Sequence, residues 1–329
     1  MKHILHLSML VVGLCCAGCG GPKVYRSAEG AVWNTTYHIS YRASSDLHDS
    51  IRAVMKQVEM SLSPFAKGSL ISRVNRGEDV CADSLLVRIL GESRRVCALS
   101  GGAFDPTVSP LVNLWGFGYK PGDPEPSQEK VDSLLQLVGI GECSVSADGR
   151  VVKKHPQTEF NFSAITKGYG CDLVGEMLAR NGATDYMVEI GGEIAMRGRN
   201  PKGHDWHIQI DAPVESDGAP VHEQLVVLPL TDCGVATSGN YRNYRETGEG
   251  RVWHTISPVT GRPAITDILS ATVIAPSAML ADALATACMA SPASEALDMV
   301  SAIPDVEALI VTPDTVLVTE GLGERLSWR

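Results

Sequence analysis

One segment near the end of the chain most restricts how this protein can fold. Residues 277–289, S-A-M-L-A-D-A-L-A-T-A-C-M, have a helical pattern that is apolar on nearly every face. A helix of this kind must be enclosed on all sides, so the chain has to build further layers of structure around it. Its interior polar residues, Asp282 and Thr286, are four positions apart and share one face.

A buried carboxylate such as that of Asp282 needs a partner. A carboxylate and a hydroxyl on one helix face suit a hard cation such as Mg²⁺, which prefers oxygen ligands and shares its coordination shell with phosphates. The alternative is an ion pair with a buried basic residue, for example Lys167. The residues themselves allow both interpretations.

A second informative segment covers residues 160–172, F-N-F-S-A-I-T-K-G-Y-G-C-D. Its first residues predict a short strand and its later ones a helix, with Lys167 at the junction. Gly168 and Gly170 would let the backbone approach a phosphate, and a helix start supplies free N–H groups. Because the segment lacks the P-loop spacing, a surface lysine in a tight connection is the alternative.

Three further segments carry residues suited to ligand contact. Residues 101–110 combine two glycines and two prolines around Asp105, which predicts a stiff loop. Residues 237–241 predict a loop of small residues with exposed hydroxyls and amides. Residues 254–261 predict a strand that ends in a turn, where His254 is able to move protons near neutral pH, unless it is a structural histidine.

The order of expected elements determines the fold class. Strands and helices come in mixed order, without regular βαβ alternation, which predicts an α+β fold: a single interwoven two-lobed unit of mixed or antiparallel sheet with packed helices. The strands are expected at 33–41, 186–190, 207–210, 225–228, 252–256 and 271–274, and the main helices at 46–62, 84–99, 127–137, 277–289 and 293–301.

The N-terminus has the pattern of a secretory signal. An apolar run over residues 4–14 is too short to span a membrane and is followed by small residues. The sequence Cys16-Ala17-Gly18-Cys19 resembles a bacterial lipobox, which predicts a lipid anchor on Cys19; simple cleavage is the alternative. The chain is thus expected to comprise a lipoprotein signal peptide (1–19), a tether (20–30) and a folded domain (31–329).

Charge and cysteine content exclude other classes of protein. The net charge of -10 and the absence of a basic run argue against nucleic-acid binding. Six cysteines remain beyond the signal, widely spaced and without a C-x-x-C motif, which argues against a zinc site. We expect buried thiols or one disulfide among Cys81, Cys97, Cys143, Cys171, Cys233 and Cys288.

A series of short motifs extends over residues 33–290. They are T-T-Y-H-I, L-S-P-F, S-x-I-S-R-V-N-R, G-G-A-F-D-P-T, L-W-G-F-G, A-I-T-K-G-Y, E-I-G-G-E-I, A-T-S-G-N-Y, H-T-I-S-P-V-T-G-R-P and A-D-A-L-A-T-A. In type and order they resemble the FAD:protein FMN transferases, or ApbE-type flavin transferases.

The resemblance implies a reaction. FAD would bind with Mg²⁺, a threonine hydroxyl of an acceptor protein would attack the FMN-side phosphorus, and AMP would leave. The acceptor threonine of this family lies in a D-x-T-S-G-A-T-like motif, usually in a membrane redox subunit. The resemblance and the N-terminal signal together imply a lipid-anchored protein of the bacterial cell envelope that faces the periplasm.

The resemblance also implies roles for individual residues. His254 would accept the threonine proton, with Asp282 as a second catalytic residue. Mg²⁺ would be held by Asp282, Thr286 and the backbone oxygens of Ala164 and Ala285. The residues implied in FAD binding are Trp33, Ala103, Phe104, Asp105, Asn161, Lys167, Ser238 and Ile256.

Some positions depart from the family pattern. Asn161 and Ser257 replace aspartates, and Asn34 replaces a glycine. Loss of two acids would weaken a magnesium site or favour hydrolysis over transfer. The alternatives are therefore a Mg²⁺-dependent FAD pyrophosphatase that releases FMN and AMP, and a non-catalytic flavin-binding lipoprotein.

Overall fold

The computed structural model describes residues 21–326 apart from 119, 121, 124, 215–222, 241–243 and 248–249. The predicted signal peptide, 1–19, with its lipobox Cys19, lies outside the described residues. Within the described part, no helix is both long enough and apolar enough to cross a bilayer.

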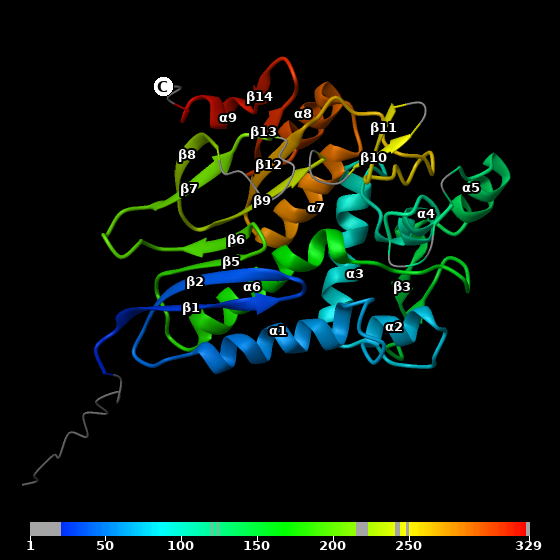
Figure 1. The fold of residues 1–329 in the computed structure, drawn as a ribbon. Coiled ribbons are helices and arrows are strands. Elements are labelled where there is room, and N and C mark those ends of the chain that lie inside the picture. The colour runs from blue at the N-terminus through cyan, green and yellow to red at the C-terminus, as the bar shows by residue number, and fades with distance from the viewer. Residues whose placement is uncertain are drawn as a thin grey trace, which may run out of the picture.

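The centre of the fold is an eight-stranded sheet in which every neighbouring pair of strands is antiparallel. Helices cover one of its faces (Figure 1), and the predicted α+β class is confirmed. In spatial order the strands are β1 (Val24–Val32), β2 (Thr35–Ala43), β5 (Tyr186–Ile190), β6 (Glu193–Arg197), β9 (Cys233–Gly239), β12 (Ser270–Ala275), β13 (Glu307–Val311) and β14 (Val316–Val318).

The remaining elements surround this sheet. The helices are α1 (His48–Leu62), α2 (Leu70–Asn75), α3 (Ser84–Leu99), α4 (Ser109–Leu114), α5 (Gln128–Leu135), α6 (Ser163–Arg180), α7 (Ala278–Met289), α8 (Ala293–Ser301) and α9 (Glu320–Gly323), with short 3₁₀ turns at Pro106–Val108 and Ile140–Glu142. Three hairpins pair β3 (Ser144–Val145) with β4 (Val151–Val152), β7 (Trp206–Asp211) with β8 (Gln224–Leu230), and β10 (Tyr244–Thr247) with β11 (Gly250–Trp253).

Helix α7 is buried on all sides, as the sequence predicts. It packs between α6 and strands β9 and β12. Successive side chains of β13 point to opposite faces of the sheet. Ala308 and Ile310 belong to the hydrophobic core that contains α7. Leu309 and Val311 belong to a separate core on the other face, with the β7–β8 hairpin. The sheet is therefore covered by helices on one face and by a hairpin on the other.

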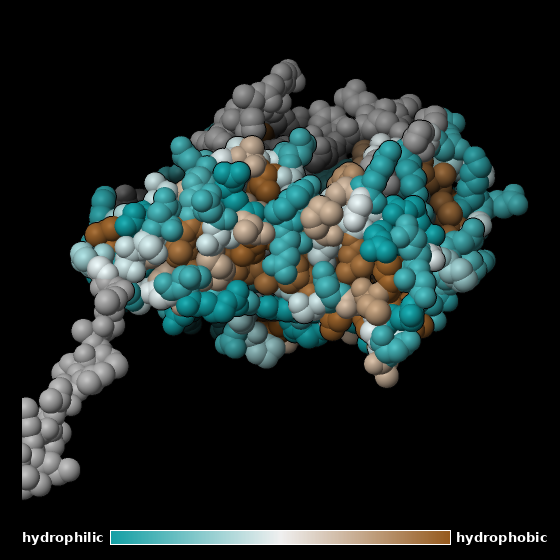
Figure 2. Space-filling model, turned by 90° about the horizontal axis from the view of Figure 1, so that it is seen from below, coloured by the Kyte–Doolittle hydropathy of each residue, from teal (hydrophilic) through white to brown (hydrophobic). Residues whose placement is uncertain are grey.

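Helix α1 covers the outside of α6 at one edge of the molecule. Its buried apolar residues, Ile51, Met55, Val58 and Leu62, recur at helical spacing and face inward. Figure 2 shows the surface from below, the side on which α1 lies in Figure 1, with hydrophilic side chains predominating between smaller hydrophobic patches.

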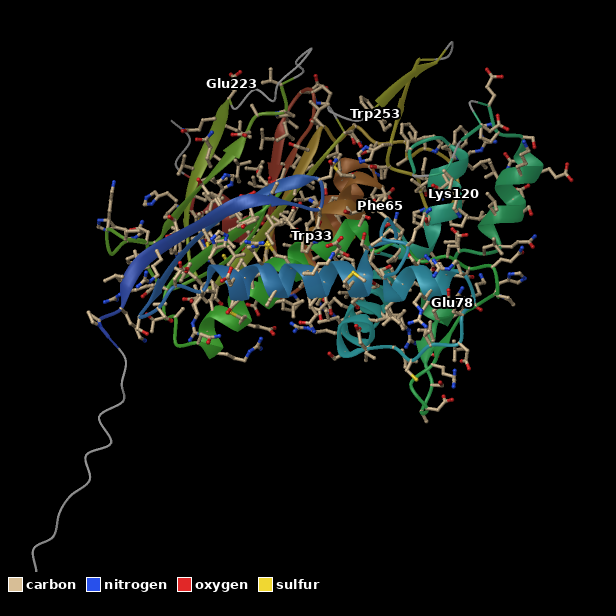
Figure 3. The ribbon with its side chains drawn as sticks, turned by 60° about the horizontal axis from the view of Figure 1, so that its bottom comes forward. Trp33, Phe65, Glu78, Lys120, Glu223 and Trp253 are labelled. Atoms are coloured by element: carbon tan, nitrogen blue, oxygen red, sulfur yellow. The ribbon has the colours of Figure 1, made fainter. Side chains whose placement is uncertain are left out.

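The β1–β2 hairpin turns through Trp33 and Asn34, with φ angles of 48° and 64°. Two left-handed residues between paired Val32 and Thr35 make a tight turn, which asparagine accepts more readily than tryptophan. Figure 3 shows Trp33 at the tip of this hairpin. A Cβ atom on Gly170 of α6 would collide with the Trp33 ring, so the ring packs directly on the helix backbone.

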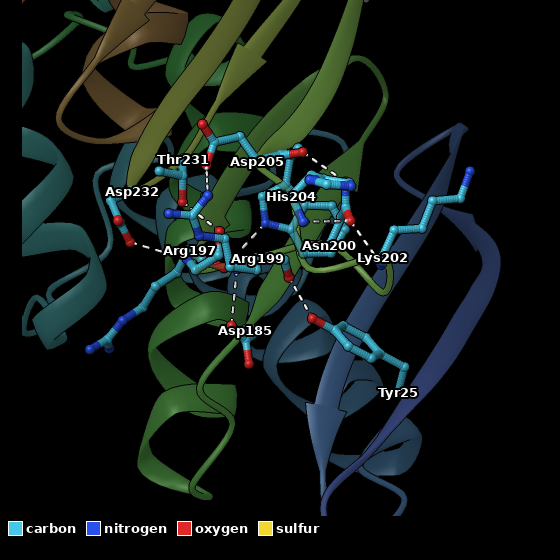
Figure 4. A network of polar contacts seen from close by, with 12 residues as sticks. Tyr25, Asp185, Arg197, Arg199, Asn200, Lys202, His204, Asp205, Thr231 and Asp232 are labelled. Atoms are coloured by element: carbon cyan, nitrogen blue, oxygen red, sulfur yellow. Dashed lines mark hydrogen bonds and ion pairs between the residues drawn. The ribbon is translucent and has the colours of Figure 1, made fainter.

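The β7–β8 hairpin is anchored to the sheet by polar contacts at its base (Figure 4). The N–H of Arg199 donates to Asp185 Oδ1 at a distance of 2.9 Å, and the carbonyl of Arg199 accepts from the Tyr25 hydroxyl at 2.5 Å. Thr231 donates to the Gly198 carbonyl at 2.6 Å. These bonds connect β1, the α6–β5 connection and the entry and exit of the hairpin.

The tether predicted at 20–30 is wrong from residue 24 onward. Residues 24–32 form β1 and pair with β2 along their whole length. Strand β1 is an edge strand in which only Ala28 is buried, so it lacks the apolar alternation that marks a strand in the sequence.

The strand predicted at the start of segment 160–172 is also wrong. The backbone N–H of Phe160 donates to the side-chain oxygen of Asn75, and its carbonyl accepts from the side-chain nitrogen, both at 2.8 Å. The Asn75 amide thus makes the backbone hydrogen bonds that a neighbouring strand would make. The apolar pattern instead reflects the buried, stacked rings of Phe160 and Phe162.

The secondary structure of two further segments, 237–239 and 252–256, also differs from the prediction. Residues 237–239, predicted as a loop, complete strand β9 in the middle of the sheet. Helix α7 lies against the other end of β9, where a Cβ on Gly234 would overlap the backbone of Ala278. The strand expected at 252–256 ends at Trp253, and Ile256 makes only an isolated bridge with Pro263.

The closeness of α6 and α7 depends on Gly168. A Cβ on Gly168 would overlap the Ala278 carbonyl, so we expect Gly168→Ala to lower the free energy of unfolding by about 1–3 kcal/mol. Gly91 is the matched control, because it lies inside α3 and an added methyl group would meet open space there; Gly91→Ala should stabilise by up to about 1 kcal/mol. Urea denaturation of both variants checks this, and similar changes in both would contradict the close contact.

Candidate functional site

A cavity of about 480 Å³ lies where α6, α7, β9 and several connecting segments meet. The residues that line it come from segments far apart in the sequence. Of the residues implied in function, those that line it are Ala103, Phe104, Asp105, Asn161, Ala164, Lys167, Ser238, His254, Ile256, Asp282 and Thr286. Trp33 and Ala285 are not part of its lining.

Oxygen atoms of α6 and α7 gather on one wall of this cavity. Asp282 Oδ2 accepts the N–H of Gly168 at 2.9 Å, and the Thr286 hydroxyl lies 3.5 Å from the carbonyl oxygen of Ala164. Asp282 is buried, as its apolar helix requires. The four-residue spacing noted in the sequence therefore places a carboxylate and a hydroxyl side by side along α6.

Lys167 forms an ion pair with Glu193, the first residue of β6. It does not form a direct ion pair with Asp282, the partner that the sequence allowed. The second carboxylate oxygen of Glu193 is buried without a hydrogen-bond partner. Sequence reasoning missed Glu193 as a site residue, although its place after Gly191 and Gly192 in the E-I-G-G-E-I motif was a usable signal.

The three charged groups shift one another's pKa values. Burial raises the pKa of Asp282, although Lys167 and the Gly168 N–H oppose the shift. Burial, together with the negative charge of Asp282, raises the pKa of Glu193 to about 8. Burial lowers the pKa of Lys167, but the attraction of Glu193 and Asp282 outweighs it, so that the pKa of this lysine is raised overall. The site thus keeps a positive lysine and retains a carboxyl proton near neutral pH.

Asp105 stiffens the loop that forms another wall. Its Oδ1 accepts from the backbone N–H and the hydroxyl of Thr107, at 2.8 and 2.5 Å, and its Oδ2 accepts from the N–H of Ile140 at 2.9 Å. With both oxygens engaged by the protein, Asp105 fixes the shape of the wall that Ala103 and Phe104 line.

Asn161 has a comparable structural contact at the start of α6. Its side-chain oxygen accepts from the backbone N–H and the hydroxyl of Ser163, at 3.0 and 2.6 Å. Ser238 reaches the cavity from β9, and His254 and Ile256 reach it from the segment after β11. The histidine therefore faces the same space as Lys167 and Asp282.

Two aromatic side chains line the cavity. Phe65, from the α1–α2 connection, and Phe117, after α4, both line it, and Phe65 is 65% exposed. Figure 3 shows Phe65 and Lys120 on the side of the molecule formed by α2–α5, and Trp253 at the β10–β11 hairpin. Neither Phe65 nor Phe117 was expected at the site from the sequence, although they belong to the L-S-P-F and L-W-G-F-G motifs.

The donors on the cavity wall suit a hard cation. Among the described residues, no group of three or more His, Cys, Asp and Glu side chains could hold a metal ion. The oxygen set of Asp282, Thr286 and the Ala164 carbonyl combines one carboxylate with two neutral oxygens, which is the donor chemistry of Mg²⁺. The unpartnered oxygen of Glu193, which also lines the cavity, adds a second carboxyl group nearby.

All six cysteines beyond the signal are free thiols, which excludes the disulfide that the sequence left open. Cys143, Cys171 and Cys288 are buried. Burial raises the pKa of Cys288 to about 12, so this thiol stays protonated.

Comparison with known proteins supports one family. The family model described as the ApbE family matches residues 33–310. The FAD:protein FMN transferase of Haemophilus influenzae is 33% identical over 97% of this chain and 96% of its own length. The FAD:protein FMN transferase of Vibrio cholerae is 36% identical over 83% of each chain.

Solved structures agree with the sequence matches. The flavin transferase ApbE from Vibrio cholerae has a TM-score of 0.80 at 31% identity and covers 93% of this chain and 100% of its own. The flavinyl transferase ApbE of Pseudomonas stutzeri, in its apo form, has a TM-score of 0.82 at 30% identity and covers 93% and 98%. The resemblance found in the motifs is confirmed, and the chain belongs to the ApbE family.

Proposed function

We propose that this protein is an FAD:protein FMN transferase that uses Mg²⁺ to move FMN from FAD to a threonine hydroxyl of an acceptor protein, with release of AMP. The observation that carries the proposal is the shared cavity. Three segments far apart in the sequence line one space. Helix α6 supplies Lys167 and the Ala164 carbonyl, α7 supplies Asp282 and Thr286, and the segment after β11 supplies His254. The names of the relatives support the transfer of FMN from FAD to a protein.

The charges of the cavity suit a pyrophosphate. Lys167 supplies a partly buried positive charge for its oxygens, and the retained carboxyl proton lowers the repulsion that Glu193 and Asp282 would exert on an anion. Asp282, Thr286 and the Ala164 carbonyl would hold Mg²⁺. Bound there, the ion would offset the negative charge of the pyrophosphate and of the departing AMP phosphate.

The transfer breaks one phosphorus–oxygen bond and forms another. The acceptor threonine oxygen bonds to the FMN-side phosphorus, the bridging oxygen leaves with AMP, and the threonine proton passes to His254 as general base. The rigid loop held by Asp105 and the start of α6 held by Asn161 keep the walls in place around the reacting atoms.

The proposal also includes an acceptor and a location for the protein. We expect a threonine in a D-x-T-S-G-A-T-like segment, in a membrane redox subunit. A lipid anchor on Cys19 would hold the enzyme at a membrane of the cell envelope, facing the periplasm. An acceptor in the same compartment would then reach the cavity.

Asp282→Asn should lower the rate of transfer by about 100-fold or more, because it removes the only charged group proposed to hold Mg²⁺. Asp298→Asn, an exposed aspartate on α8, is the control and should transfer normally. The assay incubates each protein with FAD, Mg²⁺ and an acceptor peptide and detects the FMN adduct by mass spectrometry. Free FMN and AMP without an adduct would favour the pyrophosphatase, and intact bound FAD would favour the carrier.

His254→Asn should lower the transfer rate by about 10²–10⁴-fold while FAD binding persists, because only the proton acceptor is lost. FAD affinity is measured by fluorescence quenching of the flavin, and transfer by the same peptide assay. Equal losses of binding and rate would show that the histidine holds FAD rather than the proton.

The raised pKa of Glu193 predicts a pH-dependent stability of the protein without metal or FAD. Between its ordinary value of 4.5 and about 8, the folded protein keeps a proton that the unfolded chain releases. The free energy of unfolding should therefore fall as pH rises through this interval, and Glu193→Gln should flatten the decline. Urea titrations at several pH values test this; parallel curves for the two proteins would contradict it.

A further inference from the structure

The contact between α6 and α7 contains a third polar connection beyond the two that reach the cavity. Asp172 of α6 lies four residues after Gly168 and eight after Ala164. Its Oδ1 accepts a hydrogen bond from the N–H of Ala278, and its Oδ2 accepts one from the N–H of Met279, each with a length of 2.9 Å. Polar contacts therefore recur at every turn of α6 along its crossing with α7.

Asp172 binds the part of α7 that most needs acceptors. The first N–H groups of a helix have no partner within the helix, and this end carries partial positive charge. Asp172 satisfies the N–H groups of Ala278 and Met279, and the Ser277 hydroxyl accepts the next one, from Leu280, at 3.2 Å. The whole first turn of this buried helix is thus held by side chains from outside it.

Small residues make up nearly half of α7. Five of its twelve residues are alanine, and it meets α6 at a glycine. Small side chains interdigitate little, so they resist sliding less than large ones do. A shift of α7 along its axis would separate the Thr286 hydroxyl from the Ala164 carbonyl and withdraw Asp282 from Gly168.

We propose that Asp172 is a positioning residue: by holding the first two N–H groups of α7, it sets the register in which Asp282 meets Gly168 and Thr286 meets Ala164. This inference rests on the proposed function, because it assigns those oxygens to Mg²⁺. Asp172 itself lies apart from the cavity, beside a separate cleft that Arg88 and Glu176 also line.

The test measures Mg²⁺ affinity separately from turnover. Asp172→Asn keeps the size of the side chain but places a donor against one of the two N–H groups. We expect it to weaken Mg²⁺ binding to the FAD-loaded protein about tenfold in calorimetric titrations. In the peptide assay, the Mg²⁺ concentration for half-maximal transfer should rise by the same factor, whereas the rate at saturating Mg²⁺ falls less.

Asp267→Asn is the matched control. Asp267 Oδ1 accepts the first N–H of α8, from Ala293, at 2.9 Å, and so performs the same task for a helix outside the site. It should lower stability without changing Mg²⁺ affinity. Equal losses of affinity in both variants would reduce the effect to general destabilisation and overturn the inference.

A second substitution keeps the inference testable if Asp172→Asn does not fold. Asp172→Glu retains the charge but is longer by one methylene, so it should displace the start of α7 and weaken Mg²⁺ binding. Unchanged Mg²⁺ affinity in a folded Asp172 variant would overturn the inference. Mg²⁺-independent transfer, or no transfer, by the unaltered protein would instead refute the proposed function.

Discussion

The structure depends on the close approach of two helix backbones at Gly168. Because this residue has no side chain, α7 lies against the backbone of α6, and Asp282 can accept the N–H of Gly168 inside the protein. A charge in such a place is costly unless hydrogen bonds and opposite charge compensate it. The N–H of Gly168 and the neighbouring charge of Lys167 provide this compensation. The same approach brings the Thr286 hydroxyl to the Ala164 carbonyl.

The electrostatics of the cavity follow from this geometry. Lys167 faces two buried carboxyl groups, so full ionisation would leave the site with excess negative charge. The raised pKa values of Glu193 and Asp282 show how the protein meets this cost, by retaining a proton. A divalent cation would supply the same compensation, which links metal binding to proton release. The proposed arrival of Mg²⁺ with an anionic pyrophosphate is consistent with this balance.

The polar residues around the cavity divide into two groups. Asp105 and Asn161 use their side-chain oxygens on neighbouring backbone N–H groups, and so shape the walls. Lys167 and Glu193 instead pair with each other across two elements, and their charges face the cavity. The departure of residue 161 from the family's aspartate therefore falls on a position that organises the start of α6.

The sequence by itself determined the burial of α7, the shared face of Asp282 and Thr286, and the family, because helical periodicity and local motifs are properties of neighbouring residues. It did not reveal β1, whose exposed edge lacks an apolar pattern, or the central place of residues 237–239, whose small side chains resemble a loop. Only the tertiary structure decided that Lys167 pairs with Glu193 and that Asp172 holds the start of α7. These contacts join residues 26 and 106 positions apart in the chain, and no local pattern specifies which distant partner a buried charge will meet.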